Sequence, residues 1–159
     1  LWDVGEGGES SVEGTLSEGI LWVSAALSDS TPAPGDAVSA TVFLELLDGW
    51  HVNANPAASD WLIPTSVTVN ADIPLTLSQV HYPSGESLYL AGLEETLSVY
   101  SGVVVLKAEM AVDPAARPGT SGDVRLLVRY QACDDQRCLA PEETQVVVGL
   151  RVGGGGQGE

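Results

Sequence analysis

The sequence VRLLVRY at residues 124–130 decides the fold. Apolar side chains occupy every second position of this stretch and alternate with arginines, as Val124, Leu126, Val128 and Tyr130 against Arg125 and Arg129. A period of two is that of a strand with one buried face. The alternation returns further on, at Val146, Val148, Leu150 and Val152. We therefore expect these two strands to pair as a hairpin.

Period-two patterning extends over most of the chain, and no apolar stripe with a helical period interrupts it. Turn-forming stretches separate the patterned segments, such as DSTPAPGD at 29–36 and DPAARPGTSG at 113–122. The pattern predicts about eight strands, near 20–27, 37–47, 50–54, 62–70, 75–82, 97–112, 123–132 and 143–152. Regularly spaced short strands indicate an all-β sandwich.

The length of 159 residues and a hydrophobic content of 44% suit one domain with its own core. We expect this folded unit to cover residues 17–152. The ends, 1–16 and 153–159, are rich in glycine, glutamate and serine and have the composition of flexible segments or linkers.

Charge narrows the choice of partners. The chain has 22 acidic and 6 basic residues and a net charge of −16, which repels phosphate backbones. Nucleic acid is therefore excluded as an expected partner. The acidity fits either a salt-rich habitat or a partner with a basic face, and composition does not choose between the two.

No stretch approaches the roughly 18 to 20 apolar residues of a membrane helix. The longest aliphatic run, Val103–Leu106, has the length of a strand. The chain begins at Leu1 without a methionine or a basic leader, so we expect an export signal or anchor to have been removed from it.

The two cysteines lie in the sequence Cys133-Asp-Asp-Gln-Arg-Cys138, at the connection between the last two strands. A structural disulfide is one interpretation, but closing so short a loop contributes only about 2 kcal/mol. Redox exchange is a second interpretation. A metal site is a third, since His51 and His81 with two thiolates would supply four ligands, although the usual zinc spacings are absent.

The charges beside the two cysteines differ. Arg137 directly precedes Cys138, whereas Asp134 and Asp135 directly follow Cys133. A cation favours the thiolate and carboxylates disfavour it, so Cys138 is expected to have the lower pKa and to be the attacking sulfur. Cys133 would then resolve the mixed disulfide. Such exchange needs no bound cofactor and no metal.

The connection at residues 83–96, PSGESLYLAGLEET, shows no periodicity but carries the apolar residues Leu88, Tyr89, Leu90 and Leu93. Long loops with apolar tips often act as lids or binding loops. The alternative is a loop that packs its own leucines on the sandwich.

Three stretches resemble the N-terminal periplasmic domain of the DsbD family of thiol:disulfide interchange proteins. The most specific is VRYQACDDQRCLAPEET at 128–144, with its Y-Q-x-C and C-x-x-P-E elements. The stretches DGWHVNANPAASDWLIPTSVTV at 48–69 and YPSGESLYLAGLEETLSVYSGVVV at 82–105 support it.

The resemblance implies an immunoglobulin-like β-sandwich that receives electrons from a thioredoxin-like or membrane donor and reduces oxidised extracytoplasmic proteins, as a protein-disulfide reductase module. It implies that Cys138 attacks the partner disulfide and that Cys133 resolves it. His51 and Asn53 match strand positions beside the sulfurs, and Tyr130 flanks the pair.

The resemblance also implies that the loop at 83–96 is a cap over the cysteines, with Leu88, Tyr89, Leu90 and Leu93 as its covering residues. The implied location is periplasmic or extracytoplasmic, with a full-length protein that is free or tethered to the inner membrane. An oxidising compartment agrees with a chain whose only two cysteines form a pair. The rival interpretation is an immunoglobulin-like binding or assembly domain with an inert structural disulfide.

Overall fold

Antiparallel strands build residues 13–154, the part of the chain that the computed structural model describes. Twelve strands are present there. They are β1 (Glu13–Ser17), β2 (Leu21–Leu27), β3 (Ala37–Leu46), β4 (His51–Asn53), β5 (Ser66–Ala71), β6 (Leu75–His81), β7 (Glu86–Leu90), β8 (Glu95–Tyr100), β9 (Val103–Val112), β10 (Ser121–Tyr130), β11 (Ala132–Cys133) and β12 (Glu142–Arg151). Among the described residues, none forms a helix that is long and apolar enough to cross a membrane.

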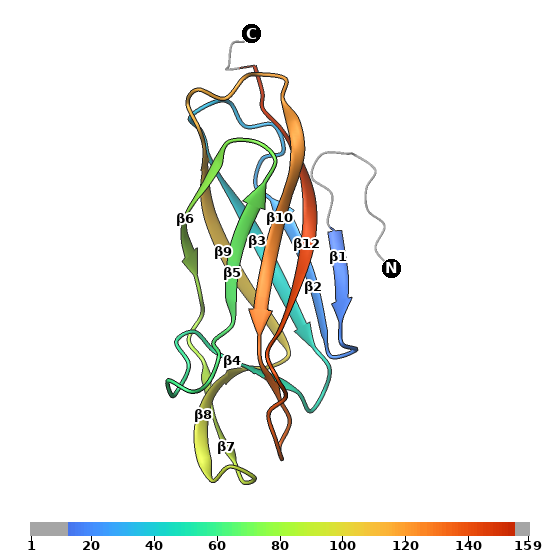
Figure 1. The fold of residues 1–159 in the computed structure, drawn as a ribbon, viewed down its shortest axis with the longest axis vertical. Helices are drawn as coiled ribbons and strands as arrows, with labels where there is room; N and C mark the ends of the chain where they lie inside the picture. Colours follow the sequence, from blue (N-terminus) through green and yellow to red (C-terminus); the bar gives the residue numbers. More distant parts are fainter. Residues whose placement is uncertain (1–12, 155–159) are drawn as a thin grey trace.

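Two sheets face each other and enclose the main core (Figure 1). One has five strands in the order β1-β2-β3-β9-β6, and the other has three in the order β12-β10-β5. β12 lies against β1 and β2, and β5 lies against β6, so the two sheets meet at both edges. This arrangement confirms the predicted all-β, immunoglobulin-like sandwich.

The alternation at 124–130 becomes strand β10. The side chains of Val124, Leu126, Val128 and Tyr130 are all buried in the core, whereas Arg129 is exposed. β10 pairs along its length with β12, with Val124 opposite Val148 and Leu126 opposite Val146. The predicted pairing of these two strands is therefore confirmed. Burial of each large apolar side chain contributes about 1.5–3 kcal/mol to the free energy of folding.

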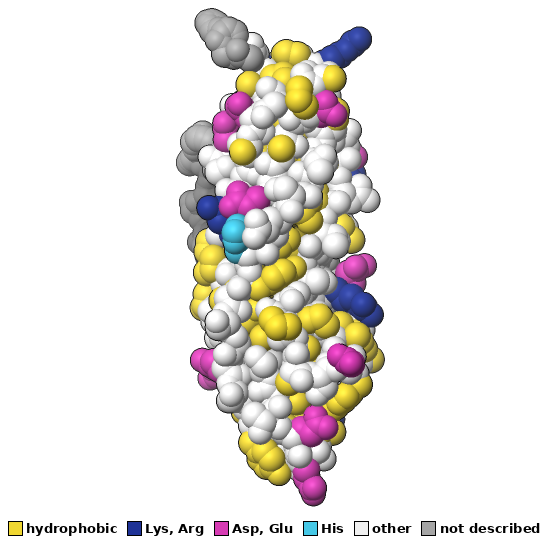
Figure 2. All heavy atoms as spheres, turned by 90° about the vertical axis from the view of Figure 1, so that its left-hand side faces the viewer, with side chains coloured by type: hydrophobic (Ala, Val, Ile, Leu, Met, Phe, Trp, Pro, Cys, Tyr) yellow, Lys and Arg dark blue, Asp and Glu magenta, His cyan; other side chains and the backbone are white. Residues whose placement is uncertain are grey.

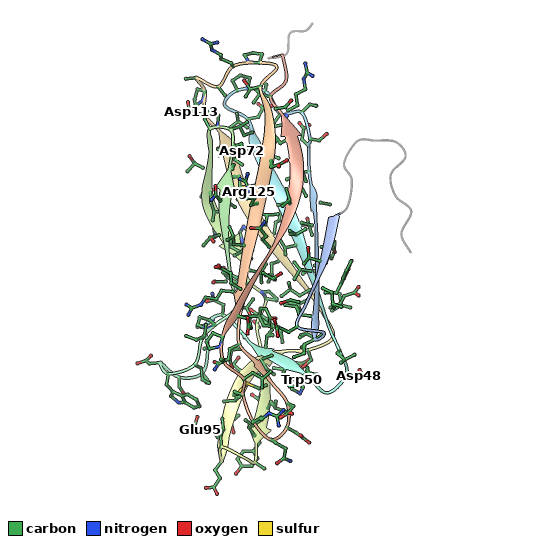
Figure 3. The ribbon with its side chains drawn as sticks, turned by 45° about the vertical axis from the view of Figure 1, so that its right-hand side comes forward. Asp48, Trp50, Asp72, Glu95, Asp113 and Arg125 are labelled. Atoms are coloured by element: carbon green, nitrogen blue, oxygen red, sulfur yellow. A yellow bond between two sulfur atoms is a disulfide. The ribbon has the colours of Figure 1, made fainter. Side chains whose placement is uncertain are left out.

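An ion pair joins β10 to the end of β5. Arg125 Nη2 lies 2.9 Å from Asp72 Oδ1. The hydrogen bond from Arg125 is the main cause that holds the pKa of Asp72 below its usual range. Figure 3 shows this pair toward one end of the molecule, with Glu95 at the opposite end.

The third sheet has four strands in the order β11-β4-β8-β7 and lies at one end of the sandwich (Figure 1). The chain enters the main sheet from β8 through Ser101 and Gly102, and Gly102 has a φ of 65°, which suits glycine. The strand predicted at 97–112 is therefore divided here, with its first part in the end sheet and its second part in the main sheet.

The sequence suggests an irregular loop at residues 83–96, but the structure shows strands there. This segment contains β7 and the start of β8, which pair with Leu88 opposite Leu97. A turn at 91–94 joins them, with the Leu93 amide donating to the Leu90 carbonyl over 3.1 Å. Pairing with β8, which the pattern of this segment alone does not reveal, is what orders it.

The first strand begins earlier than the expected unit 17–152. β1 pairs with β2 from Glu13 onward, so residues 13–16 of the segment expected to be flexible belong to the five-stranded sheet. Residues 153–154 of the other expected flexible end are described too, and Gly153 N donates to the Pro32 carbonyl over 2.8 Å. Residues 1–12 and 155–159 lie outside the described residues.

Acidic side chains are spread over the surface. On the face drawn in Figure 2 they occur from one end of the molecule to the other, with few basic side chains among them. The net charge of −16 is thus not concentrated in one patch of this face. A distributed negative charge repels anionic polymers over the whole of this face.

We expect Leu126→Ala to lower the free energy of unfolding by about 2–5 kcal/mol, because Leu126 is 0% exposed in the main core. The matched control is Leu127→Ala on the same strand, whose side chain is only partly buried and which should cost clearly less. Urea unfolding followed by circular dichroism measures both. Equal losses would contradict the assignment of the buried face of β10.

Candidate functional site

A disulfide joins Cys133 and Cys138 at the end of the sandwich that carries the small sheet, with 3.9 Å between the two Cα atoms. Cys133 belongs to β11, which pairs with β4 so that Cys133 lies opposite His51. Two backbone hydrogen bonds close the segment into a tight hairpin, from Asp134 N to Arg137 O at 2.9 Å and from Leu139 N to Ala132 O at 2.8 Å. We call residues 132–139 the cysteine hairpin.

The carboxylate of Asp134 shapes the tip of the cysteine hairpin. It accepts hydrogen bonds from the Gln136 amide at 2.8 Å and from the Arg137 amide at 2.9 Å. These two bonds are the main cause that holds the pKa of Asp134 below its usual range. Asp134 therefore acts first on its own loop, whereas the side chains of Asp135 and Arg137 are exposed.

The two sulfurs differ in their surroundings. Cys133 is 0% exposed and packs in a small apolar cluster that is separate from the main core. We call this group the cysteine cluster; its buried members are Leu62, Leu90, Leu97, Val99 and Cys133, and its partly buried members are Ala57, Leu88, Leu93 and Cys138. Cys138 is thus the cysteine that retains contact with solvent.

The β7–β8 hairpin packs against the cluster that contains the disulfide. Of the residues expected to form a cap, Leu88, Leu90 and Leu93 belong to the cysteine cluster. Tyr89 is 62% exposed and is not part of that cluster. The turn comes so close to the cysteine hairpin that a Cβ atom on Gly92 would overlap the carbonyl oxygen of Gln136.

His51 and Asn53 both lie on β4, next to β11. The Nδ1 atom of His51 lies 2.6 Å from Ser101 Oγ. The Nδ2 atom of Asn53 donates to Gln131 Oε1 at 3.0 Å and to the Ile63 carbonyl at 3.2 Å. Asn53 is thereby part of a buried amide network at the base of the cysteine hairpin.

Tyr130 is not brought into the cysteine cluster. Its ring belongs to the main core, and its hydroxyl lies 2.5 Å from Ser17 Oγ in β1. Burial is the main cause that raises the pKa of this phenol above its usual range. The contacts of Tyr130 are therefore those of a core residue that fastens β1 to the end of β10.

Several residues of the site were not found from the sequence. Leu62, Leu97 and Val99 line the buried sulfur, Gly92 permits the close approach of the turn, and Gln131 binds the base of the cysteine hairpin. The alternation of Leu97 and Val99 indicated a strand with a buried face but did not show what that face would cover. Gln131 is part of the Y-Q-x-C element, and two of its bonding partners, Asn53 and Ile63, lie far away in the sequence.

The histidines proposed as metal ligands lie in different sheets. His81 is on β6, where its Nε2 atom lies 3.3 Å from Glu109 Oε2, and His51 is on β4. In the part of the chain that the structure describes, no three His, Cys, Asp or Glu side chains are grouped as they would be around a metal ion.

We expect Asp134→Ala to loosen the tip of the cysteine hairpin, because two amides lose their acceptor. Hydrogen exchange of the Gln136 and Arg137 amides, followed by NMR, should become faster, whereas Asp134→Asn keeps an acceptor oxygen and should change less. In the native sequence, protection should be complete above about pH 4, near the pKa in the unfolded chain, and should be lost as the pH falls through the lower folded-state pKa. Unchanged exchange in Asp134→Ala would contradict this role.

We expect Gly92→Ala to push the turn of the β7–β8 hairpin away from Gln136 and to uncover the disulfide. If the substitution destabilises the conformation with the hairpin in place by about 1 kcal/mol, the population of molecules with an uncovered disulfide rises about fivefold. The rate of disulfide reduction by dithiothreitol should rise accordingly, measured by thiol alkylation. Ala91→Ser, at the exposed neighbouring position, is the control and should leave the rate unchanged. Equal rates in both variants would show that the turn does not limit access.

Comparisons with known proteins agree with this architecture. A family model described as "Thiol:disulfide interchange protein DsbD, N-terminal" matches residues 20–150. Among solved structures, the chain is similar to the N-terminal periplasmic domain of ScsB from Proteus mirabilis, with a TM-score of 0.60, 12% sequence identity, and coverage of 85% of this chain and 49% of that chain. The chain thus spans about half the length of that ScsB structure.

The chain is also similar to the DsbD n-terminal domain of Neisseria meningitidis in the reduced form, with a TM-score of 0.43, 17% identity, and coverage of 80% of this chain and 82% of that chain. No significant match was found among curated protein sequences. The likeness to ScsB supports the fold alone, since one fold hosts many functions. The family match, however, runs from residue 20 to residue 150 and includes both cysteines, so the chain belongs to the family of DsbD N-terminal domains.

Proposed function

We propose that this domain is a thiol–disulfide exchange module that takes electrons from a thioredoxin-like or membrane donor and passes them to oxidised extracytoplasmic proteins through Cys133 and Cys138. The observation that carries the proposal is the disulfide itself, which joins one buried and one partly exposed sulfur beneath a β-hairpin. Family membership supports the exchange chemistry. The donor and acceptor proteins and the periplasmic location are part of the proposal.

The exchange begins with the reduced domain. The Cys138 thiolate attacks one sulfur of a partner disulfide, the partner S–S bond breaks, and the released partner sulfur takes up a proton. Cys133 then loses its proton and attacks the Cys138 sulfur, so that the mixed disulfide breaks and the Cys133–Cys138 bond forms. The partner gains two electrons and two protons, and a donor dithiol later returns them to the domain.

Accessibility supports these roles. Cys138 lies at the rim of the cysteine cluster, and Cys133 lies fully inside it. The first attack requires that a partner sulfur reach the nucleophile, which only Cys138 permits without deep opening of the site. Arg137 is exposed beside Cys138, where its positive charge favours a thiolate.

The β7–β8 hairpin acts as the cap in this proposal. Its leucines Leu88, Leu90 and Leu93 cover the sulfurs, and its turn lies against Gln136, so a partner that reaches Cys138 has to displace it. The cap would protect the reduced pair from unspecific oxidants and open for a partner that binds this end of the domain. Tyr89, exposed on the outer side of the cap, is available to such a partner.

One observation favours a second function. The full burial of Cys133 is also what a permanent bridge would show, and an immunoglobulin-like binding or assembly domain with an inert disulfide has the same contacts. The two functions differ in the behaviour of the thiols, because an inert bridge resists reduction until the domain unfolds.

We expect single-cysteine variants to separate these functions. In Cys133→Ser, the remaining Cys138 should form a mixed disulfide with oxidised glutathione about tenfold or more faster than Cys133 does in Cys138→Ser, because only Cys138 is accessible. Mass spectrometry follows the adduct, and circular dichroism verifies that both variants are folded. Equal rates, or adducts that form only after unfolding, would reject the exchange mechanism and leave the binding domain.

A further inference from the structure

A buried pair of side-chain amides lies at the base of the cysteine hairpin. Asn53 on β4 is 0% exposed, and Gln131, which precedes β11, is 9% exposed. Their side chains bond to each other, from Asn53 Nδ2 to Gln131 Oε1 at 3.0 Å. These residues are 78 positions apart in the sequence, so the pair joins the strand that carries Cys133 to its neighbour β4.

The orientation of both amides is determined by the backbone around them. Gln131 Oε1 accepts from the Ile63 amide at 3.0 Å, and Gln131 Nε2 donates to the Leu139 carbonyl at 3.2 Å. Because Gln131 therefore presents its oxygen, Asn53 must present its NH₂ group, which also donates to the Ile63 carbonyl at 3.2 Å. A flipped side-chain amide at either position would place a donor against a donor or an acceptor against an acceptor.

This orientation leaves Asn53 Oδ1 without a partner. Within residues 13–154 it is the one buried side-chain oxygen or nitrogen that has no hydrogen bond. A buried acceptor in this state has lost its hydrogen bonds to water without gaining one in the protein, which lowers the stability of the folded state. Since buried polar groups are otherwise almost always bonded, the exception needs a physical explanation.

The strand register places Asn53 diagonally across from Cys133, whose sulfur becomes a donor when the disulfide is reduced. Cys133 lies opposite His51 in the strand pair. The backbone N–H of Asn53 donates to the backbone carbonyl of Gln131 at 3.4 Å, which continues the same antiparallel register. Residues two apart on a strand share one face, so Asn53 and Cys133 are diagonal neighbours on the same face of this pair. In the oxidised protein the Cys133 sulfur carries no proton and cannot donate.

Reduction of the disulfide creates a thiol at Cys133 that needs a hydrogen-bond acceptor. A Cys133 thiol would be a buried donor, and the apolar side chains packed in its cluster, Leu62, Leu90, Leu97 and Val99, have no acceptor. Asn53 Oδ1, on the same face of the strand pair, is an acceptor that lacks a donor.

We propose that Asn53 Oδ1 accepts a hydrogen bond from the Cys133 thiol in the reduced protein, so that the Asn53–Gln131 pair is a positioning device that favours the reduced state. The biological use of this state rests on the proposed function. In the reduction, a donor dithiol supplies two electrons and two protons and becomes a disulfide, and the Cys133–Cys138 bond breaks. One proton remains on the Cys133 sulfur and is shared with Asn53, which keeps Cys133 a neutral thiol while Cys138 attacks.

The first test is the reduction equilibrium of the disulfide in glutathione or dithiothreitol buffers. Asn53→Ala removes the acceptor in the reduced state, and its loss of the bond to Gln131 affects both redox states alike. We expect the equilibrium constant for reduction to fall about three- to tenfold, which corresponds to a potential about 15–30 mV more negative. The matched control is Asn55→Ala, which also loses an amide hydrogen bond, from Asn55 Nδ2 to the Thr65 carbonyl at 3.0 Å, but should leave the equilibrium unchanged.

The second test observes the hydrogen bond directly and does not require exchange with any protein. In Cys138→Ser, Cys133 is the remaining thiol, and its infrared S–H stretching band should lie at lower frequency than in the Asn53→Ala, Cys138→Ser double variant. In the native sequence, the ¹³Cγ NMR signal of Asn53 should shift on reduction, which needs no variant.

An unchanged reduction equilibrium in Asn53→Ala together with an Asn53 ¹³Cγ signal that does not respond to reduction would overturn the inference. Failure of the exchange function would appear separately, as a bridge that dithiols do not reduce, or a reduced pair that does not react with partner disulfides, although the S–H band is shifted.

Discussion

The pairing of β11 with β4 is the constraint on which the site depends. It is short, with Ala132 opposite Val52 and Cys133 opposite His51, yet it attaches the cysteine hairpin to a separate sheet at the end of the sandwich. Had the connection between β10 and β12 remained a free loop, both sulfurs would be exposed alike. Through this pairing one sulfur is buried and the other lies at the rim, and the difference in burial supports the proposed division of labour between them.

The site is thus assembled from segments that are distant in the sequence. β4 supplies the neighbouring strand, the chain after β4 supplies Leu62, and the β7–β8 hairpin supplies the leucines that pack in the cysteine cluster. Leu88, Leu90 and Leu93 of the β7–β8 hairpin belong to the cysteine cluster, whereas β4 contributes Val52 to the main core, so the hairpin can move while β4 and the sandwich stay in place. A small apolar cluster opens at lower cost than a whole domain core, since less apolar area is exposed to water. This suits a disulfide that has to be reached by a partner and then covered again.

The sequence predicted the main sandwich well and the site only in outline. The alternation at Val124, Leu126 and Val128 was sufficient to predict the strand, because a strand with one buried face shows a period of two in its apolar residues. The β7–β8 hairpin was hidden because Gly85 and Gly92 have the appearance of loop residues. Gly92 is needed only because Gln136, which lies 44 positions later in the sequence, comes close to it.

Side-chain networks between distant residues were equally hidden. The sequence indicated that Asp134 would act on the charge of Cys133, but its carboxylate is engaged by the Gln136 and Arg137 amides. The Asn53–Gln131 pair depends on a register between β4 and the start of the cysteine hairpin that no local pattern encodes. Local periodicity therefore predicts elements, whereas contacts across elements require the folded structure.

The most direct test of the account compares two rates in the same folded protein. One is the reduction of the Cys133–Cys138 bridge by reduced thioredoxin, followed by alkylation and mass spectrometry; the other is global unfolding, measured in urea and extrapolated to water. If the proposed exchange function is correct, reduction is faster than unfolding and increases with thioredoxin concentration, because only the proposed cap has to open. Reduction that proceeds at the unfolding rate, whatever the thioredoxin concentration, would contradict it and identify the bridge as a structural one.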